Sequence, residues 1–452
     1  MNKPNIVLII TDQQTRSTIS AYGNNRTHTP NMDSLAAEGV TFRNSYCASP
    51  VCSPGRAAIL TGEMPHTAGV NVNDFPVRDG IPNIGEVFRD VGYKTAWAGK
   101  WNLPESFPKE ADAIPGFLNL DWQRRSYRDL GTSMDEDITD AAVNYLSEDR
   151  AQPFVLGVSL YNPHDICFWI MDRDHDVLPG VPEGAALPEL PENFDSDPLE
   201  SEFVRWLRLQ DRVVGGDDPY VDPDCYWNEL RWTDDWDELH WRRYLYVYER
   251  LVELADIQVG RVLGTLRDQG LENNTVVILT SDHGEGIAAH RWVTKEMLYE
   301  EPVTVPLIIR WPGVVPSGRF DSTRLASSID IAPTMYDYAE ITDRVELPGW
   351  SLRPAIEDPT APGRQYIIAE LQPDLLRMEL KGRMVRTPSH KYMAFSAGSH
   401  PEMFFDLEQD PLEMVDLARS DTHQEVLSEH RKLLNSWVDQ ANDDFETGSA
   451  QL

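Results

Sequence analysis

The run NIVLIITD at residues 5–12 decides the fold that we expect for this chain. Five aliphatic residues in succession are followed by a threonine and a carboxylate. A strand with apolar side chains on both faces is covered by helices on both sides, as happens in parallel sheets. The run therefore predicts a central strand of a parallel sheet, with Asp12 at its carboxyl end.

Helices and buried strands alternate outward from this run. Residues 29–42 and 81–101 each combine a helix pattern with a following short apolar strand. Residues 249–271 predict a long amphipathic helix, and residues 274–285 predict a buried strand that runs into a polar turn. This alternation predicts an α/β fold with a largely parallel sheet flanked by helices.

Two regions depart from this pattern. Residues 172–240 hold 20 Asp and Glu against 5 Arg, with four interleaved tryptophans, and we expect an insertion over one edge of the sheet. It is either a substrate-facing lid or a solvated acidic loop whose tryptophans pack locally. Short strands and a terminal helix follow from about residue 350, so we expect residues 1–350 to form a catalytic domain and residues 351–452 a small α+β domain.

Composition narrows the function classes. The 452 residues are 41% hydrophobic and carry a formal net charge of −34, with 74 acidic against 40 basic residues. Nucleic acid and anionic membranes need a basic surface, so neither is expected as a partner. The four cysteines have neither disulfide-framework nor zinc-finger spacing. The first apolar run is too short for a signal segment or a membrane span, although a chain trimmed of its signal would look the same.

Polar residues follow the predicted strands where their carboxyl ends meet. Asp12, Lys100 and the pair Asp282 and His283 all occupy this position, where α/β sheets gather reactive groups. With Gln13, they offer oxygen ligands and one imidazole, a set that suits Ca²⁺ or Mg²⁺ and admits Mn²⁺. Each residue alone also has an ordinary structural role as a helix cap or a turn residue.

Cations and histidines surround these residues in the sequence. Arg56, Lys100 and Lys295 lie at expected loop positions and would suit an anionic group held beside a metal. His164 and His290 are candidate general acids toward a leaving group. A structural histidine that is satisfied by hydrogen bonds is the alternative for both.

The segment CSPGR at 52–56, followed by LTG at 60–62, resembles the C-x-P-x-R…L-T-G signature of type I sulfatases, which have the fold of the alkaline phosphatase superfamily. The resemblance covers nearly the whole chain outside 172–240. Further matching segments are TDQ at 11–13, GKW at 99–101, NPH at 162–164, TSDHGE at 280–285, H…K…YEE at 290–301 and FFDLEQDPLEMVDL at 404–417. The resemblance implies a mixed, mostly parallel sheet and a smaller C-terminal domain.

The resemblance also implies a chemistry for Cys52. In that family the signature cysteine is oxidised to formylglycine by a maturation enzyme, which we expect to act on an exposed turn. One hydroxyl of the hydrated aldehyde attacks sulfur while an acid protonates the leaving oxygen. The second hydroxyl is then deprotonated, and sulfate is expelled.

Roles for the other residues follow from the same resemblance. Calcium would be held by Asp12, Gln13, Asp282, His283 and residue 52. Arg56 would stabilise the formylglycine, and Lys100 and Lys295 would hold the sulfate oxygens. The residues that would contact the sulfate, the leaving group or the rest of the substrate are His164, His290, Trp101 and Asn102.

Two departures from the family pattern bear on mechanism. Asn102 follows Trp101 where many relatives have a histidine, and an amide cannot act as a general acid, so that role passes to His164 or His290. The first metal motif is Asp-Gln instead of Asp-Asp. This variant is found in sulfatases and in phosphonate or phosphodiester hydrolases.

The sequence thus predicts a sulfatase that acts on a sulfated carbohydrate. A phosphonate monoester or phosphodiester hydrolase is the alternative on the same scaffold. A protein that binds sulfated glycans without turnover is the second alternative, if Cys52 stays a thiol. The acidic surface would repel a long polyanion, so we expect a small sulfated sugar or an oligosaccharide end, with tryptophans of residues 201–241 stacking on it.

Overall fold

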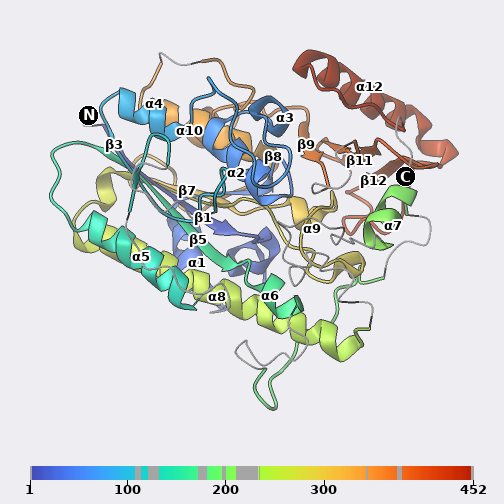
Figure 1. Cartoon of the computed structure of the whole chain (residues 1–452), viewed down its shortest axis with the longest axis horizontal. Coiled ribbons are helices and arrows are strands. Elements are labelled where there is room, and N and C mark those ends of the chain that lie inside the picture. Colours follow the sequence, from blue (N-terminus) through green and yellow to red (C-terminus); the bar gives the residue numbers. More distant parts are fainter. Residues whose placement is uncertain are drawn as a thin grey trace, which may run out of the picture.

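A computed structural model gives the structure of the protein. It describes residues 3–106, 114–120, 132–171, 181–195, 200–209, 233, 235–342, 345–373 and 379–448. A large central sheet lies between two layers of helices, and a small sheet with one long helix, α12 (Gln424–Ala441), stands at one end of the molecule (Figure 1).

The large sheet has eight strands in the order β4-β3-β5-β1-β6-β7-β2-β8. Strand β1 pairs in parallel with β5 and with β6, and β7 is antiparallel to both of its neighbours. The predicted mixed, mostly parallel sheet is therefore confirmed. The strand bounds are β1 (Asn5–Asp12), β2 (Val40–Tyr46), β3 (Lys94–Gly99), β4 (Leu118–Asn119), β5 (Phe154–Pro163), β6 (Thr275–Ser281), β7 (Leu307–Arg310) and β8 (Arg319–Ser327).

Strand β1 shows why the sheet needs cover on both faces. All eight of its residues are buried, and its side chains alternate between two apolar clusters. Ile6, Leu8 and Ile10 pack with helices α2, α4 and α10, whereas Val7 and Ile9 pack with α1, α5 and α8. The helix bounds are α1 (Pro30–Glu38), α2 (Cys52–Thr61), α4 (Ile84–Asp90), α5 (Thr132–Leu146), α8 (Glu238–Asp268) and α10 (Ile331–Tyr338).

Helix α8 begins earlier than the sequence pattern suggested. The predicted helix started at residue 249, but the structure adds about three turns before it. Trp241, Tyr244 and Tyr248 recur at helical spacing in these turns and pack with α6 in a further apolar cluster. The remaining described α-helices are α3 (Pro65–Ala68), α6 (Ile166–Met171), α7 (Glu202–Leu209), α9 (Glu300–Val303), α11 (Arg353–Glu357) and α12 (Gln424–Ala441).

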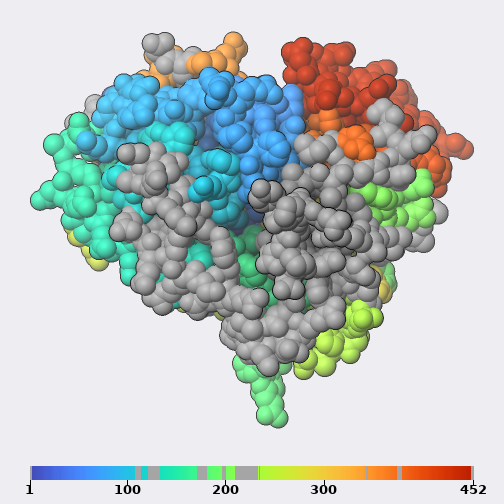
Figure 2. Space-filling view, viewed as in Figure 1, coloured from blue at the N-terminus to red at the C-terminus, as the bar shows by residue number. Residues whose placement is uncertain are grey.

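The C-terminal region forms a four-stranded antiparallel sheet in the order β12-β11-β10-β9, covered by α12. This confirms the small α+β unit, whose strands all lie beyond residue 350. Its atoms form a lobe beside the N-terminal third of the chain (Figure 2), where His66 of α3 bonds Glu370 and packs edge-on against Trp437. The strand bounds are β9 (Ile367–Leu371), β10 (Gly382–Arg386), β11 (His390–Phe395) and β12 (Glu402–Asp406).

Most of the predicted acidic insertion, with Trp227 and Trp232, lies outside the described residues. The two tryptophans that are described pack locally, because Trp206 lies against Phe203 and Trp236 contacts Trp241 edge-on. The lid remains a prediction. Among the described helices, none has the length and apolar composition needed to cross a membrane.

The contact between β5 and β3 gives a stability test. A Cβ atom on Gly157 would lie 2.1 Å from the indole of Trp97, which is fully buried. We therefore expect Gly157→Ala to lower the free energy of unfolding by about 1–3 kcal/mol in urea titrations. Gly264→Ala in α8 is the control, since its Cβ meets nothing within 4 Å. Equal losses in both variants would contradict this packing.

Candidate active site

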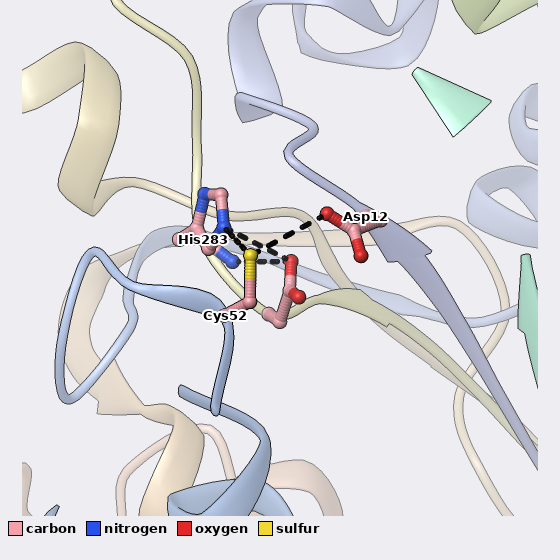
Figure 3. Close-up of side chains that lie close together, drawn as sticks. Asp12, Cys52 and His283 are labelled. Atoms are coloured by element: carbon pink, nitrogen blue, oxygen red, sulfur yellow. Dashed lines mark hydrogen bonds and ion pairs between the residues drawn. The ribbon is translucent and has the colours of Figure 1, made fainter. Parts of the chain in front are cut away.

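Cys52 lies at the end of the sheet where β1 and β6 terminate. It is the first residue of α2, and its side chain points at those of Asp12 and His283 (Figure 3). The predicted exposed turn is wrong, because Cys52 is only 2% exposed. Gly55 explains the close packing: a Cβ there would lie 2.5 Å from the carbonyl oxygen of Asp282, so the first turn of α2 sits against that backbone.

Four buried side chains from distant segments converge at this point. Asp12, Cys52, Asp282 and His283 each offer one ligand atom, and these atoms lie within 4.8 Å of one another. The Cys52 sulfur is 4.0 Å from Asp12 Oδ1 and 3.2 Å from His283 Nε2. His283 Nδ1 donates to the carbonyl oxygen of Gly284 at 2.8 Å, which leaves the Nε2 lone pair facing the cluster.

Arg56 fixes the two carboxylates from behind. Its guanidinium is fully buried and donates to Asp12 Oδ2 at 2.9 Å and to Asp282 Oδ2 at 3.0 Å. Lys100 Nζ lies 2.5 Å from the same Asp12 oxygen. Burial would raise the pKa of Asp12, but Lys100 and Arg56 outweigh it and hold that pKa well below its usual range. Asp12 Oδ1 is left for the cluster, whereas Asp282 Oδ1 also accepts from the backbone amides of Gln13 and His283.

Gln13 adds an amide oxygen, and Glu285 determines which way the amide points. Gln13 Nε2 donates to Glu285 Oε2 at 2.6 Å. Gln13 Oε1 therefore faces inward and accepts from Lys295 Nζ at 3.1 Å. Glu285 is itself held by the hydroxyl of Tyr244 and the backbone amide of Thr294.

Sequence reasoning missed this supporting role of Glu285. Its place in the DHGE turn was visible, but its partner Tyr244 lies in the first turns of α8, before residue 249 where the predicted helix began. The assembled donor set consists of carboxylate and amide oxygens with one imidazole, and it fits a hard divalent cation. Ca²⁺ binds six to eight oxygens in general, so water or substrate would complete its shell.

Cations cover the other side of the Cys52 sulfur. Lys295 Nζ lies 3.0 Å from Sγ and donates to His164 Nε2 at 3.2 Å. Burial would raise the pKa of the Cys52 thiol, but Lys100 and Lys295 outweigh it and lower that pKa. Burial and the same lysines hold the pKa of His164 well below its usual value, so its imidazole is neutral and accepts from Lys295. An anion placed here meets two ammonium groups.

His290 is not brought into this cluster. In the described part of the chain, none of its hydrogen bonds involves Cys52 or the residues around it. Its ring stacks on Tyr299 at a centroid distance of 4.0 Å, and Nε2 lies 3.4 Å from the Asn193 amide nitrogen. Burial, with Arg208 and Lys391 nearby, lowers the pKa of His290 to about 3. The expectation that it contacts sulfate or the leaving group finds no support in this placement.

Trp101 and Asn102 also differ from their predicted roles. The indole of Trp101 is buried in the apolar core, edge-on to Trp97, and donates to the carbonyl oxygen of Leu103 at 2.7 Å. It therefore has no free face for a sugar. Asn102 donates from Nδ2 to Ser53 Oγ at 2.5 Å and accepts from Ser106, so its amide supports the residue next to Cys52.

The Sulfatase family model matches residues 4–341 of the 452. The chain belongs to the sulfatase family. A second model, for the C-terminal region of N-sulphoglucosamine sulphohydrolase, matches residues 288–440. The predicted resemblance is confirmed, and the protein is a sulfuric ester hydrolase with the fold of the alkaline phosphatase superfamily. Sulfatases generally depend on a metal ion, and the four-residue cluster around Cys52 offers a place for one.

Individual relatives extend this comparison. A Delta 4,5-hexuronate-2-O-sulfatase of Bacteroides thetaiotaomicron is 31% identical over 98% of this chain and 91% of its own length. The solved structure of a 2-O GAG sulfatase has a TM-score of 0.85 at 28% identity and covers 99% of this chain and 95% of that one. A phosphonate monoester hydrolase of Agrobacterium radiobacter has a TM-score of 0.77 at 21% identity, with 97% and 96% covered, and shares the fold.

The Gln13 amide gives a test of the metal site. We expect Glu285→Gln to weaken Ca²⁺ binding by about 10- to 100-fold in calorimetric titrations, because a neutral amide no longer forces Gln13 Oε1 inward. Glu408→Gln, at an exposed residue, is the matched control. Unchanged Ca²⁺ affinity in the Glu285 variant would contradict the orienting role.

Proposed function

We propose that this sulfatase removes sulfate from a small sulfated sugar or an oligosaccharide end, using a formylglycine made from Cys52. One observation carries the proposal: the Cys52 sulfur lies between a buried set of metal-binding atoms and the ammonium group of Lys295. A nucleophile at this position would have a bound metal ion on one side and an ammonium group on the other. Both positive charges would stabilise a sulfate group placed beside it. The identity to a Delta 4,5-hexuronate-2-O-sulfatase supports a sugar substrate.

The burial of residue 52 indicates when the oxidation of Cys52 would take place. A maturation enzyme would replace the thiol by an aldehyde oxygen, and the aldehyde would then add water to give two hydroxyls on one carbon. Because Cys52 is 2% exposed in the first turn of α2, we assign this oxidation to a stage before folding is complete.

We assign Ca²⁺ to the oxygens of Asp12, Gln13 and Asp282, with His283 as its nitrogen ligand. Bound there, the ion would supply positive charge to the oxygens of residue 52 and of the sulfate. Arg56 binds both aspartates and Lys100 pairs with Asp12, which orients the two carboxylates for a cation. Lys295, with Lys100, holds the sulfate oxygens by charge-assisted hydrogen bonds.

His164 is our candidate for the group that protonates the leaving oxygen. Its imidazole is neutral beside the Lys295 ammonium, and a bound sulfate would compensate that positive charge. The pKa of His164 would therefore rise on substrate binding, so the ring could take up a proton and pass it to the leaving oxygen. Asn102 has no proton of this kind to give.

A phosphonate monoester or phosphodiester substrate is the second candidate. The specific observation behind it is the shared fold with a phosphonate monoester hydrolase at a TM-score of 0.77. A tetrahedral oxyanion of either element fits two lysines and a metal. The Sulfatase family match over residues 4–341 favours sulfate.

Turnover and the mass of the residue 52 peptide test the proposal together. Protein from a host that makes formylglycine should carry a peptide about 18 Da lighter than the thiol form and should release sulfate from a 2-O-sulfated uronate sugar. Lys295→Ala should lower kcat/KM by about 10²–10³, whereas Lys432→Ala, at an exposed residue, should not.

Three outcomes would contradict the proposal. Faster turnover of a phosphonate monoester than of any sulfate ester would favour the second candidate. An unmodified thiol together with tight binding of the sulfated sugar would favour a protein that binds without turnover. Full activity in Lys295→Ala would remove the proposed contact with sulfate.

A further inference from the structure

The structure contains a second group of metal-ligating side chains away from Cys52. His290, Glu301 and Glu413 each offer one ligand atom, and these atoms lie within 4.8 Å of one another. They come from three places in the fold: the 3₁₀ turn Ala289–Arg291, helix α9, and the loop after β12. His290 and Glu301 belong to motifs that the sequence analysis singled out and that the proposed reaction does not use.

Two of these residues have a buried polar atom without a hydrogen-bond partner in the described part of the chain. The two atoms are His290 Nδ1 and Glu301 Oε2. His290 is 1% exposed, so bulk water does not compensate its Nδ1 atom. Glu413 Oε1, in contrast, forms an ion pair with Lys391 at 2.9 Å. Buried acceptors without a partner are costly unless a cation or donor satisfies them.

The other polar atoms of the same residues are held in place. Asn193 Nδ2 donates to Glu301 Oε1 at 2.9 Å and lies 3.4 Å from His290 Nε2. The backbone amide of Glu300 donates to Glu413 Oε2 at 2.7 Å. His290 and Glu301 are thus each held through one atom and keep a second atom without a partner, as is typical of side chains that bind metals.

Cations are unevenly shared among the carboxylates here, because Glu413 already pairs with Lys391. Glu300, next in sequence, has three cationic neighbours: Lys391 at 3.3 Å, Arg16 at 3.6 Å and Arg386 at 4.0 Å. Glu301, in contrast, forms no ion pair among the described residues. A divalent cation between Glu301 and Glu413 would give Glu301 the positive partner that its neighbour already has.

We propose that His290, Glu301 and Glu413 bind a zinc ion. One imidazole nitrogen and two carboxylate oxygens, with a water as the fourth ligand, match the coordination number and donor types of zinc. Ca²⁺ would need more oxygen ligands than these residues supply. The site is separate from the Ca²⁺ site assigned under the proposed function.

The position of this site indicates what the ion would do. His290 and Glu301 bracket the loop that carries Lys295, and Glu413 follows the C-terminal sheet. Zinc would tie both ends of the Lys295 loop to the C-terminal unit. It would therefore stabilise the fold and hold Lys295 near residue 52 without touching the substrate.

The test uses the full-length chain with Cys52→Ala, because a thiolate beside His283 is itself a zinc ligand. After chelation and dialysis, we expect one zinc per chain to be regained and the melting temperature to rise. Anomalous diffraction at the zinc edge should place the ion among His290, Glu301 and Glu413. Adding Glu301→Gln should weaken zinc binding by about 10- to 100-fold. Glu408→Gln and His400→Gln, at exposed residues, are the matched controls.

The opposite results would overturn the proposal. They are no zinc retained by the Cys52→Ala chain, an anomalous peak elsewhere, or equal zinc affinity in the Glu301→Gln variant. His290→Gln could impair folding because His290 is buried. The test of the zinc site therefore uses the isosteric Glu301→Gln variant and the diffraction experiment. None of these readouts depends on sulfatase activity.

Discussion

The ion pairs of the buried Arg56 guanidinium with Asp12 and Asp282 are the constraint on which the rest of the site depends. Strands β1 and β6 run in parallel register, with Thr11 opposite Ser281, so Asp12 and Asp282 must end side by side. Two buried carboxylates at that spacing repel each other and favour protonation. The guanidinium of Arg56 binds one oxygen of each, and because Arg56 belongs to α2, the same contact fixes the start of that helix and so Cys52. Removing one partner of such a buried ion pair costs about 3–5 kcal/mol.

The part of the site that the sequence predicts is the part that the sheet imposes. The apolar run at residues 5–12 identified β1, and the rule that ligands gather at the carboxyl ends of parallel strands brought Asp12, Lys100 and Asp282 together. The contacts of Arg56 and Lys295 could not follow from that rule, because neither residue ends a strand. The sequence analysis expected both cations beside a metal and an anion, and the resemblance gave them roles, but only the structure shows Arg56 bound to the two aspartates and Lys295 beside Cys52.

The burial of Cys52 and the placement of His290 depend on contacts between residues far apart in the sequence. Cys52 is buried because Gly55 lets α2 pack against the backbone of Asp282. His290 turns away from Cys52 and stacks on Tyr299, near Glu413, more than a hundred residues later. No periodicity within a short window carries that information. Asn102 stands where many relatives have a histidine, and the structure gives it a supporting role. Its amide donates a hydrogen bond to Ser53, the residue next to Cys52.

The central claim is that residue 52 attacks sulfur, and a Cys52→Ser variant tests it most directly. A serine hydroxyl can form the O–S bond while the sugar oxygen leaves, but it lacks the second hydroxyl whose deprotonation would expel sulfate. After incubation with a sulfated sugar, the tryptic peptide that contains residue 52 should gain about 80 Da, with one desulfated sugar released per chain. Release of desulfated sugar with no added mass on that peptide would contradict the claim.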